Sequence, residues 1–187
     1  VGVIVAMADK LETLAGMFGI GNLPTGDRDP FALRRHALGV IRMLVEKGLP
    51  LDLNRLVRAA SQSFGGLLPE PEKSNEQLLE FIYERLAGYL REQGFSAQEA
   101  DAVIAARVPW GVIPKALQAV RAFAELPEAP ALAAANKRIG NILKKAGDVD
   151  AHVNPELLKE PAEQALYAAM QQTVPQADAQ FAAGDYT

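Results

Sequence analysis

The sequence has 187 residues, of which 49% are hydrophobic and 22% charged, a composition that supports one or two cores and excludes a wholly disordered chain. A net charge of −4 excludes a polycation that binds every nucleic acid. The absence of cysteine excludes disulfides and thiolate chemistry and fits a protein of the reducing cytoplasm.

The chain opens on its longest apolar run, residues 1–8. This run is far shorter than the roughly 20 residues that span a bilayer, and no basic segment precedes it, so we expect neither a membrane partner nor a signal peptide. Asp9 interrupts it too early for a long core strand, and the spacing predicts a buried helix over residues 3–18. Because Val1 lies inside this element with no Met before it, we interpret the chain as a piece of a longer protein.

Two further helices are predicted in the first half. Asp29 is a favoured N-cap and Pro30 a favoured first helical residue, so we expect a helix from Pro30 to about Lys47, followed by a glycine. Asp52 predicts the cap of a third helix that ends near residues 65–66. The residues that follow combine two prolines with several charges and form the best linker candidate in the chain.

The second half is also predicted to be helical. Ser74 with Gln77, and Ser96 with Glu99, have the spacing of capping boxes, and each serine therefore predicts a helix start. The other helices expected from periodicity and proline positions are 114–126, 130–146, a short element from 154, and 161–172. We therefore predict an all-α fold in two parts that meet near residue 70.

The glycine-rich segment between the first two predicted helices has some features of a phosphate-binding loop. Gly21 and Gly26 have the spacing of a Walker loop, but Asp27 and Arg28 follow where that loop needs a lysine and a hydroxyl residue. The dinucleotide fingerprint fails as well, since Pro24 stands at its third glycine position. We expect no nucleotide site here.

Arg34 has an unusual position on the second predicted helix. At about 100° per residue it lies among apolar residues, whereas Arg35 lies on the polar side. An unpaired buried guanidinium is very unfavourable. We expect Arg34 either to pair with Asp27 or Asp29 and so hold the preceding loop, or, like Arg35, to contact RNA or another subunit.

Charge is unevenly distributed, since residues 103–145 carry seven Lys or Arg against two Asp or Glu, and residues 70–102 carry three against eight. In the helix predicted from Pro130, apolar residues gather around Leu132, and five donors lie on the opposite side: Lys137, Arg138, Asn141, Lys144 and Lys145. Cations suit phosphate neutralisation, and an amide can read a base or ribose. The alternative is that these cations only complement the helix dipole and keep the surface solvated.

Few other residues indicate chemistry, and none is predicted to be catalytic. Trp110 could stack on a splayed RNA base, but a tryptophan between two prolines more often fills a helix junction. His36 and His152 are the only histidines, and neither has a His or Cys partner at ligand spacing. We therefore expect no metal site and a solvated His36.

One long stretch, residues 8–53, resembles the characteristic stretch of the β subunit of bacterial heterotetrameric glycyl-tRNA synthetases: ADKLETLAGMFGIGNLPTGDRDPFALRRHALGVIRMLVEKGLPLDL. Later stretches are similar to the rest of that subunit: FIYERLAGYLREQGF, VPWGVIPKALQAV and NKRIGNILKKA. The resemblance covers essentially the whole chain. It implies that residues 1–70 are the C-terminal part of an HD-like helical domain. Residues 71–187 would be an anticodon-binding-like helical domain, similar to that of arginyl-tRNA synthetases and truncated at its C-terminus.

The resemblance also implies a function. In that family the β subunit supplies tRNA binding, and a separate α subunit of the α2β2 tetramer activates glycine with ATP and Mg. We therefore expect this fragment to be noncatalytic alone and to bind no cofactor. Its expected partners are tRNA(Gly) and the α subunit, and we expect no DNA partner.

Two alternatives remain open. The chain could be a fragment of an HD-type metal-dependent phosphohydrolase, since Asp9 matches the position of that family's last metal ligand, although one carboxylate alone does not hold a divalent metal. It could instead be a helical protein-interaction module whose basic helix docks on an acidic partner.

Overall fold

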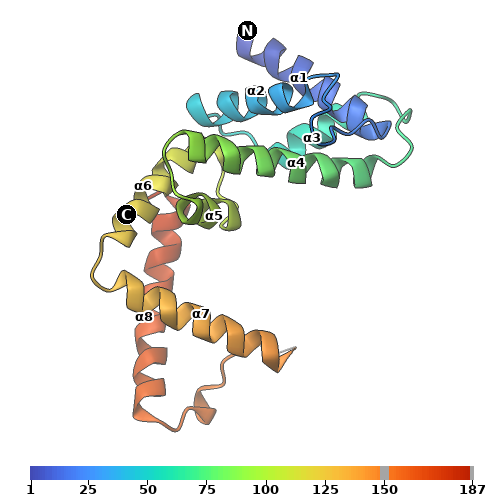
Figure 1. Ribbon diagram of the computed structural model, residues 1–187. Coiled ribbons are helices and arrows are strands. Elements are labelled where there is room, and N and C mark those ends of the chain that lie inside the picture. The colour runs from blue at the N-terminus through green and yellow to red at the C-terminus, as the bar shows by residue number, and fades with distance from the viewer. Residues whose placement is uncertain (148–151, 186–187) are drawn as a thin grey trace. The chain divides into compact units, whose positions relative to one another are not determined.

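The computed structural model describes residues 1–147 and 152–185, and every regular element in these ranges is helical (Figure 1). The predicted all-α fold class is confirmed. The α-helices are α1 (Gly2–Gly19), α2 (Leu33–Glu46), α3 (Leu53–Gln62), α4 (Pro71–Glu92), α5 (Ala97–Ala105), α6 (Ile113–Ala124), α7 (Ala129–Ala146) and α8 (Pro161–Ala182). Two short 3-10 helices are η1 (Trp110–Val112) and η2 (Pro155–Leu157). None of the helices in the described ranges combines the length and hydrophobicity needed to cross a bilayer.

The predicted helix ends are confirmed where a cap fixes them locally. The Asp52 carboxylate accepts a hydrogen bond from the Arg55 backbone N–H at the start of α3. Ser96 and Glu99 form the predicted capping box at the start of α5, in which each side chain accepts from the other residue's backbone N–H. These caps satisfy backbone donors that the first helical turn leaves free.

The predicted start of α2 is wrong by three residues. The helix begins at Leu33, because Ala32 takes a left-handed backbone conformation with φ of 53° and breaks the helical path from Pro30. Asp29 still caps the helix from a distance, since its carboxylate oxygens accept the backbone N–H groups of Leu33 at 2.7 Å and Arg34 at 3.0 Å. Asp29 therefore supplies the side chain that pairs with the first N–H groups, but the N-cap position belongs to Ala32, so the N-cap predicted at Asp29 and the helical position given to Pro30 are both wrong.

Three other predicted limits are also wrong. α3 ends at Gln62 and not near residues 65–66. α4 begins at Pro71 and not at Ser74, whose hydroxyl donates to the Pro71 carbonyl from inside the first turn. α8 continues to Ala182 and does not end at Gln172. It runs through Pro175, which loses one backbone donor but keeps a φ that a helix accepts.

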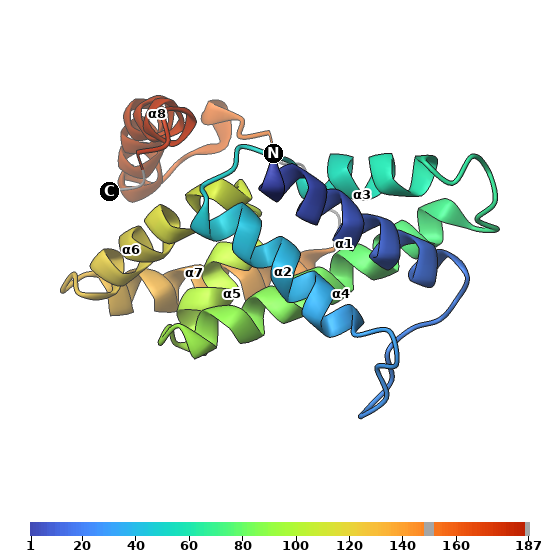
Figure 2. The same ribbon diagram turned by 90° about the horizontal axis from the view of Figure 1, so that it is seen from above.

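The chain forms two compact units, unit 1 (Val1–Val120) and unit 2 (Arg121–Thr187). In unit 1, α4 packs against α1, α2, α3 and α5, and α1 also packs along α2 and α3 (Figures 1 and 2). The side chains that are fully buried in this core are large aliphatic residues, among them Leu14, Ile41, Leu44, Leu78, Ile82 and Leu86. A domain boundary near residue 70 remains a prediction about the longer protein.

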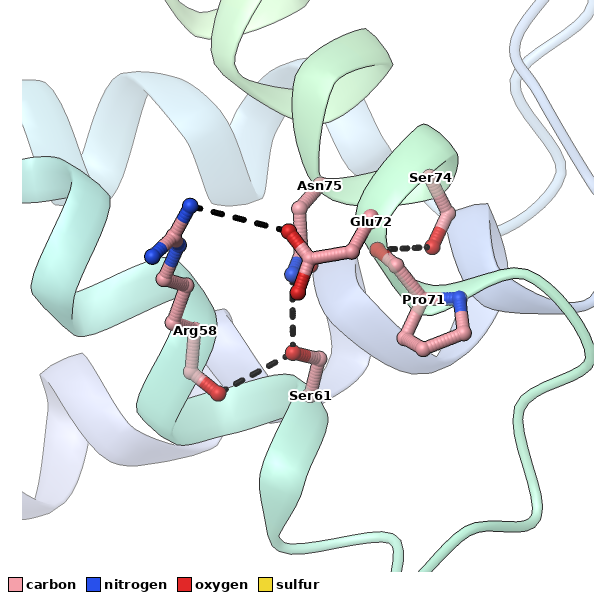
Figure 3. A network of polar contacts seen from close by, with 6 residues as sticks. All are labelled: Arg58, Ser61, Pro71, Glu72, Ser74 and Asn75. Atoms are coloured by element: carbon pink, nitrogen blue, oxygen red, sulfur yellow. Dashed lines mark hydrogen bonds and ion pairs between the residues drawn. The ribbon is translucent and has the colours of Figure 1, made fainter.

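The connection from α3 to α4 is held by polar contacts (Figure 3). Asn75 Nδ2 donates to Ser61 Oγ at 3.0 Å, and both side chains are buried. Ser61 Oγ in turn donates to the Arg58 carbonyl at 3.0 Å. On the surface above them, the Arg58 guanidinium lies 3.6 Å from the Glu72 carboxylate. The segment predicted as a linker therefore joins two helices that contact each other directly.

Candidate nucleic-acid interface

The basic face predicted for the helix from Pro130 lies on α7, in unit 2. Pro130 occupies the first turn, and Lys144 and Lys145 occupy the last turn, where cations interact favourably with the helix dipole. The side chains of the predicted site are all exposed: Lys137, Arg138, Asn141, Lys144 and Lys145. No acidic residue lies within α7. The face thus presents donors and positive charge to solvent.

No acidic side chain forms an ion pair with the basic face within the described part of the chain. The ion pairs found there involve Arg42, Arg58, Lys73 and Arg85, and none involves a cation of α7. Four of the five predicted residues line one shallow hollow of about 420 Å³ on the helix surface: Lys137, Arg138, Asn141 and Lys145. Cations and an amide that converge on an open hollow suit a phosphate or ribose better than a buried ligand.

The opposite side of α7 is apolar, as predicted, but it is not buried by the described residues. Leu132, Ile139, Ile142 and Leu143 are between 50% and 56% exposed. From residue 121 onward, Ala129 is the one buried residue in the described ranges. The apolar and basic residues of α7 therefore lie on opposite sides of the helix, as predicted. The apolar side, however, is not buried against any other described part of the chain.

Arg34 holds the loop before α2, but through a different partner from the predicted one. Its Nη2 donates to the Gly26 carbonyl at 2.6 Å, while its backbone N–H reaches Asp29. The predicted ion pair with Asp27 or Asp29 is wrong for the described residues, since the Arg34 guanidinium donates to a backbone carbonyl and forms no ion pair among them. Arg35 is exposed, and the interface or tRNA contact predicted for Arg34 and Arg35 stays a prediction.

Packing of α2 on α4 brings Arg34 beside two arginines that no sequence pattern indicates. A hollow of about 230 Å³ is lined by Arg34, Leu38, Arg85 and Arg91, together with Glu84 and Glu92. The Arg85 guanidinium lies 3.7 Å from Glu84 and 5.6 Å from the centre of the Phe81 ring. The two glutamates offset part of the charge, so this hollow is a weaker candidate for phosphate than α7.

Trp110 fills a helix junction. It is 3% exposed, and its ring centre lies 5.3 Å from that of Tyr83, whose face is covered by the Arg107 guanidinium at 3.9 Å. Since the tryptophan ring is covered by protein, it offers no platform for a splayed base. The junction role favoured from the sequence is confirmed.

The part of the chain that the structure describes gives no support for a metal site or catalytic site at either histidine or at Asp9. His36 is half-buried, and its Nδ1 is enclosed without a hydrogen-bond partner among the described residues, so the prediction of a solvated side chain is wrong. His152 and Asp9 are exposed. Residues 1–147 and 152–185 contain no group of three or more His, Cys, Asp or Glu that could hold a metal ion.

The sequence matches a known family model over more than half its length. The model of the glycyl-tRNA synthetase beta subunit matches residues 1–105. The whole chain is 72% identical to the glycine–tRNA ligase beta subunit of Paracidovorax citrulli (strain AAC00-1). It is 70% identical to that of Acidovorax sp. (strain JS42) and 69% to that of Acidovorax ebreus (strain TPSY), again over the whole chain. The chain belongs to the glycyl-tRNA synthetase beta-subunit family.

Membership of this family confirms the resemblance predicted from residues 8–53. The family model ends at residue 105, and the relatives extend the similarity over α6, α7 and α8. The chain spans about a quarter of the length of these beta subunits, 26% in each of the three. The basic face of α7 therefore belongs to the part that the relatives share and the family model leaves out.

Proposed function

We propose that this chain is a tRNA-binding part of a glycyl-tRNA synthetase β subunit, with the basic face of α7 as its contact to tRNA(Gly). The α subunit of an α2β2 tetramer would carry out glycine activation with ATP and Mg in the cytoplasm. The chain itself would be noncatalytic. The relatives at 72% and 70% identity are glycine–tRNA ligase beta subunits, which supports this proposal.

One observation carries the proposal: four cations on one side of α7 are exposed and form no ion pair within the described part of the chain. Phosphate neutralisation by Lys and Arg releases condensed counterions and supplies most sequence-independent affinity for nucleic acid. Asn141 lies among these cations, and its amide can donate and accept, which suits a base edge or a ribose hydroxyl. If the cations of α7 served only to keep the surface solvated, they would not need to be grouped around the amide of Asn141.

The test is charge reversal on α7, measured by filter binding of bacterial glycine tRNA. We expect Lys144→Glu with Lys145→Glu to weaken binding by at least about tenfold, since two phosphate contacts become repulsive. The matched control is Lys115→Glu with Lys159→Glu, which changes two exposed lysines outside α7 by the same charge. An equal loss in both variants would show that only net charge matters, and would refute a site on α7.

Recognition of the correct tRNA is a separate part of the proposal. We expect glycine tRNA to bind more tightly than an unrelated tRNA once salt has screened non-specific phosphate contacts. Equal binding of both tRNAs at every salt concentration would refute recognition of the anticodon while leaving a general RNA contact in place.

The two alternative functions have less support. An HD-type phosphohydrolase would need ligands in addition to Asp9, and the relatives are named as ligase subunits. For an interaction module that binds no RNA, the charge reversal on α7 would leave tRNA affinity unchanged.

A further inference from the structure

A second surface feature lies in unit 1, where the segment before α3, the middle of α4 and the α5–η1 connection surround a cleft of about 790 Å³. The residues that give it its chemical character are Leu51, Asp52, Glu76, Leu79, Glu80 and Arg107. Three are acidic and one is basic, so the cleft is negative overall; we name it the acidic cleft. All of its lining residues belong to unit 1, so it is independent of the basic face of α7.

The acidic cleft also offers apolar surface. Leu51 is 41% exposed on its wall, and Leu79 is half-buried beside it. The Tyr83 ring packs against Trp110 on one side and is covered by the Arg107 guanidinium, so neither aromatic ring is free to stack with a ligand. Contact with an occupant would therefore come from leucine side chains and carboxylates.

The exposed glutamates of α4 are spaced so that they repel one another along the helix. Four exposed glutamates succeed one another at steps of four residues: Glu72, Glu76, Glu80 and Glu84. Like charges at this spacing destabilise a helix by about 0.2–0.5 kcal/mol per pair. Glu72 lies 3.6 Å from Arg58 and Glu84 lies 3.7 Å from Arg85. Glu76 and Glu80 have no ion-pair partner within the described residues, and these are the two that line the acidic cleft.

We propose that the acidic cleft is a docking site for a partner protein segment that carries a lysine or arginine next to an apolar residue. The cation would lie between Glu76 and Glu80 and relieve their repulsion, and the apolar side chain would pack on Leu51 and Leu79. RNA is a poor occupant, because Asp52, Glu76 and Glu80 repel phosphate. Charge complementarity of this kind selects partners and orients them at an interface.

The experiment measures fluorescence anisotropy of a labelled synthetic peptide on the 187-residue chain. The peptide has about twelve residues and is built from leucine and arginine, a length typical of segments that lie in a protein groove. Two control peptides replace every arginine by glutamate or every leucine by serine. We expect the leucine–arginine peptide to bind, and each control peptide to bind at least about tenfold more weakly.

Variants of the chain then locate the site. Glu76→Gln with Glu80→Gln is expected to weaken peptide binding by about tenfold, and Leu51→Ser by a smaller factor. The matched control, Glu12→Gln with Asp101→Gln, removes the same charge from exposed positions on α1 and α5 and is expected to change binding less than about twofold. Glycine tRNA affinity should remain unchanged in all of these variants, which separates this proposal from the one on α7.

Three results would overturn the docking site. Absence of peptide binding to the unmodified chain is one. Equal weakening by the Glu12 and Asp101 changes is another, because attraction to the overall negative charge would explain it. Equal binding of the serine peptide is the third, since it would leave Leu51 and Leu79 without a role.

Discussion

Asn75 Nδ2 donates a hydrogen bond of 3.0 Å to Ser61 Oγ, and this pair joins α4 to α3 beneath the surface of unit 1 (Figure 3). Removing the Asn75 amide deletes one buried hydrogen bond, while Ser61 Oγ keeps its own bond to the Arg58 carbonyl. The loss of such a bond typically destabilises a protein by about 0.5–1.5 kcal/mol. We therefore expect Asn75→Ala to lower the free energy of unfolding by this amount in urea denaturation.

A double-mutant cycle isolates the hydrogen bond from the lost packing. Ser61→Ala leaves Asn75 Nδ2 without its acceptor, and the double variant leaves neither side chain unpaired. The double variant should therefore lose less stability than the sum of the single losses, by about 0.5–1.5 kcal/mol. Strict additivity would show that the bond does not stabilise the junction.

A second prediction concerns Tyr89, whose hydroxyl donates to Glu46 Oε1 at 3.2 Å across α4 and α2. Burial, followed by the hydrogen bond to Glu46 and its negative charge, raises the pKa of Tyr89 above its ordinary value of 10.0. Since the folded pKa is raised, the contribution to stability is complete below pH 10 and is lost as the pH rises towards the folded pKa.

The measurement compares the unmodified chain with Tyr89→Phe by urea unfolding between neutral and strongly alkaline pH. The phenylalanine variant has no hydroxyl to ionise, so the stability difference between the two proteins should change steadily above pH 10. Other groups that titrate there, such as lysines, affect both proteins alike. Parallel pH profiles would contradict the raised pKa.

A third prediction contrasts two glycines of unit 1. A Cβ on Gly111 would lie 2.8 Å from the backbone of Gly48 and Leu49, which follow α2. Because backbone atoms cannot move aside as a flexible side chain does, Gly111→Ala should destabilise the fold by about 1–3 kcal/mol. A Cβ on Gly88, inside α4, would meet no described atom within 4 Å apart from its chain neighbours and the backbone of its own helix, and Gly88→Ala should stabilise the fold by about 0.5–1 kcal/mol. Thermal unfolding of both variants checks the contrast, and a destabilising Gly88→Ala would contradict it.

The features that the sequence predicted correctly depend on neighbours within one or two helical turns. Asp52 and the Ser96–Glu99 pair cap helices that start beside them, and the basic face of α7 follows from spacing within a single helix. The start of α2 was predicted wrongly because the left-handed conformation of Ala32 leaves no trace in the sequence pattern.

Contacts between residues that lie far apart in the sequence could not be predicted from the sequence pattern. The grouping of Arg34 with Arg85 and Arg91 requires α2 to pack on α4. The burial of Asn75 likewise requires α4 to meet α3, and a polar residue of this type is ordinarily expected on the surface. The acidic cleft combines segments on either side of α4, so its charge could be counted from the sequence but its shape could not.

The central claim, that α7 binds RNA phosphates, is tested most directly by the salt dependence of glycine tRNA affinity. Each phosphate contact contributes about 0.7–0.9 to the slope of log K against log salt. For Lys144→Glu with Lys145→Glu, we predict a slope that is shallower than that of the unmodified chain by about two such contributions. An identical slope in the two proteins would mean that these lysines touch no phosphate, and would contradict the account.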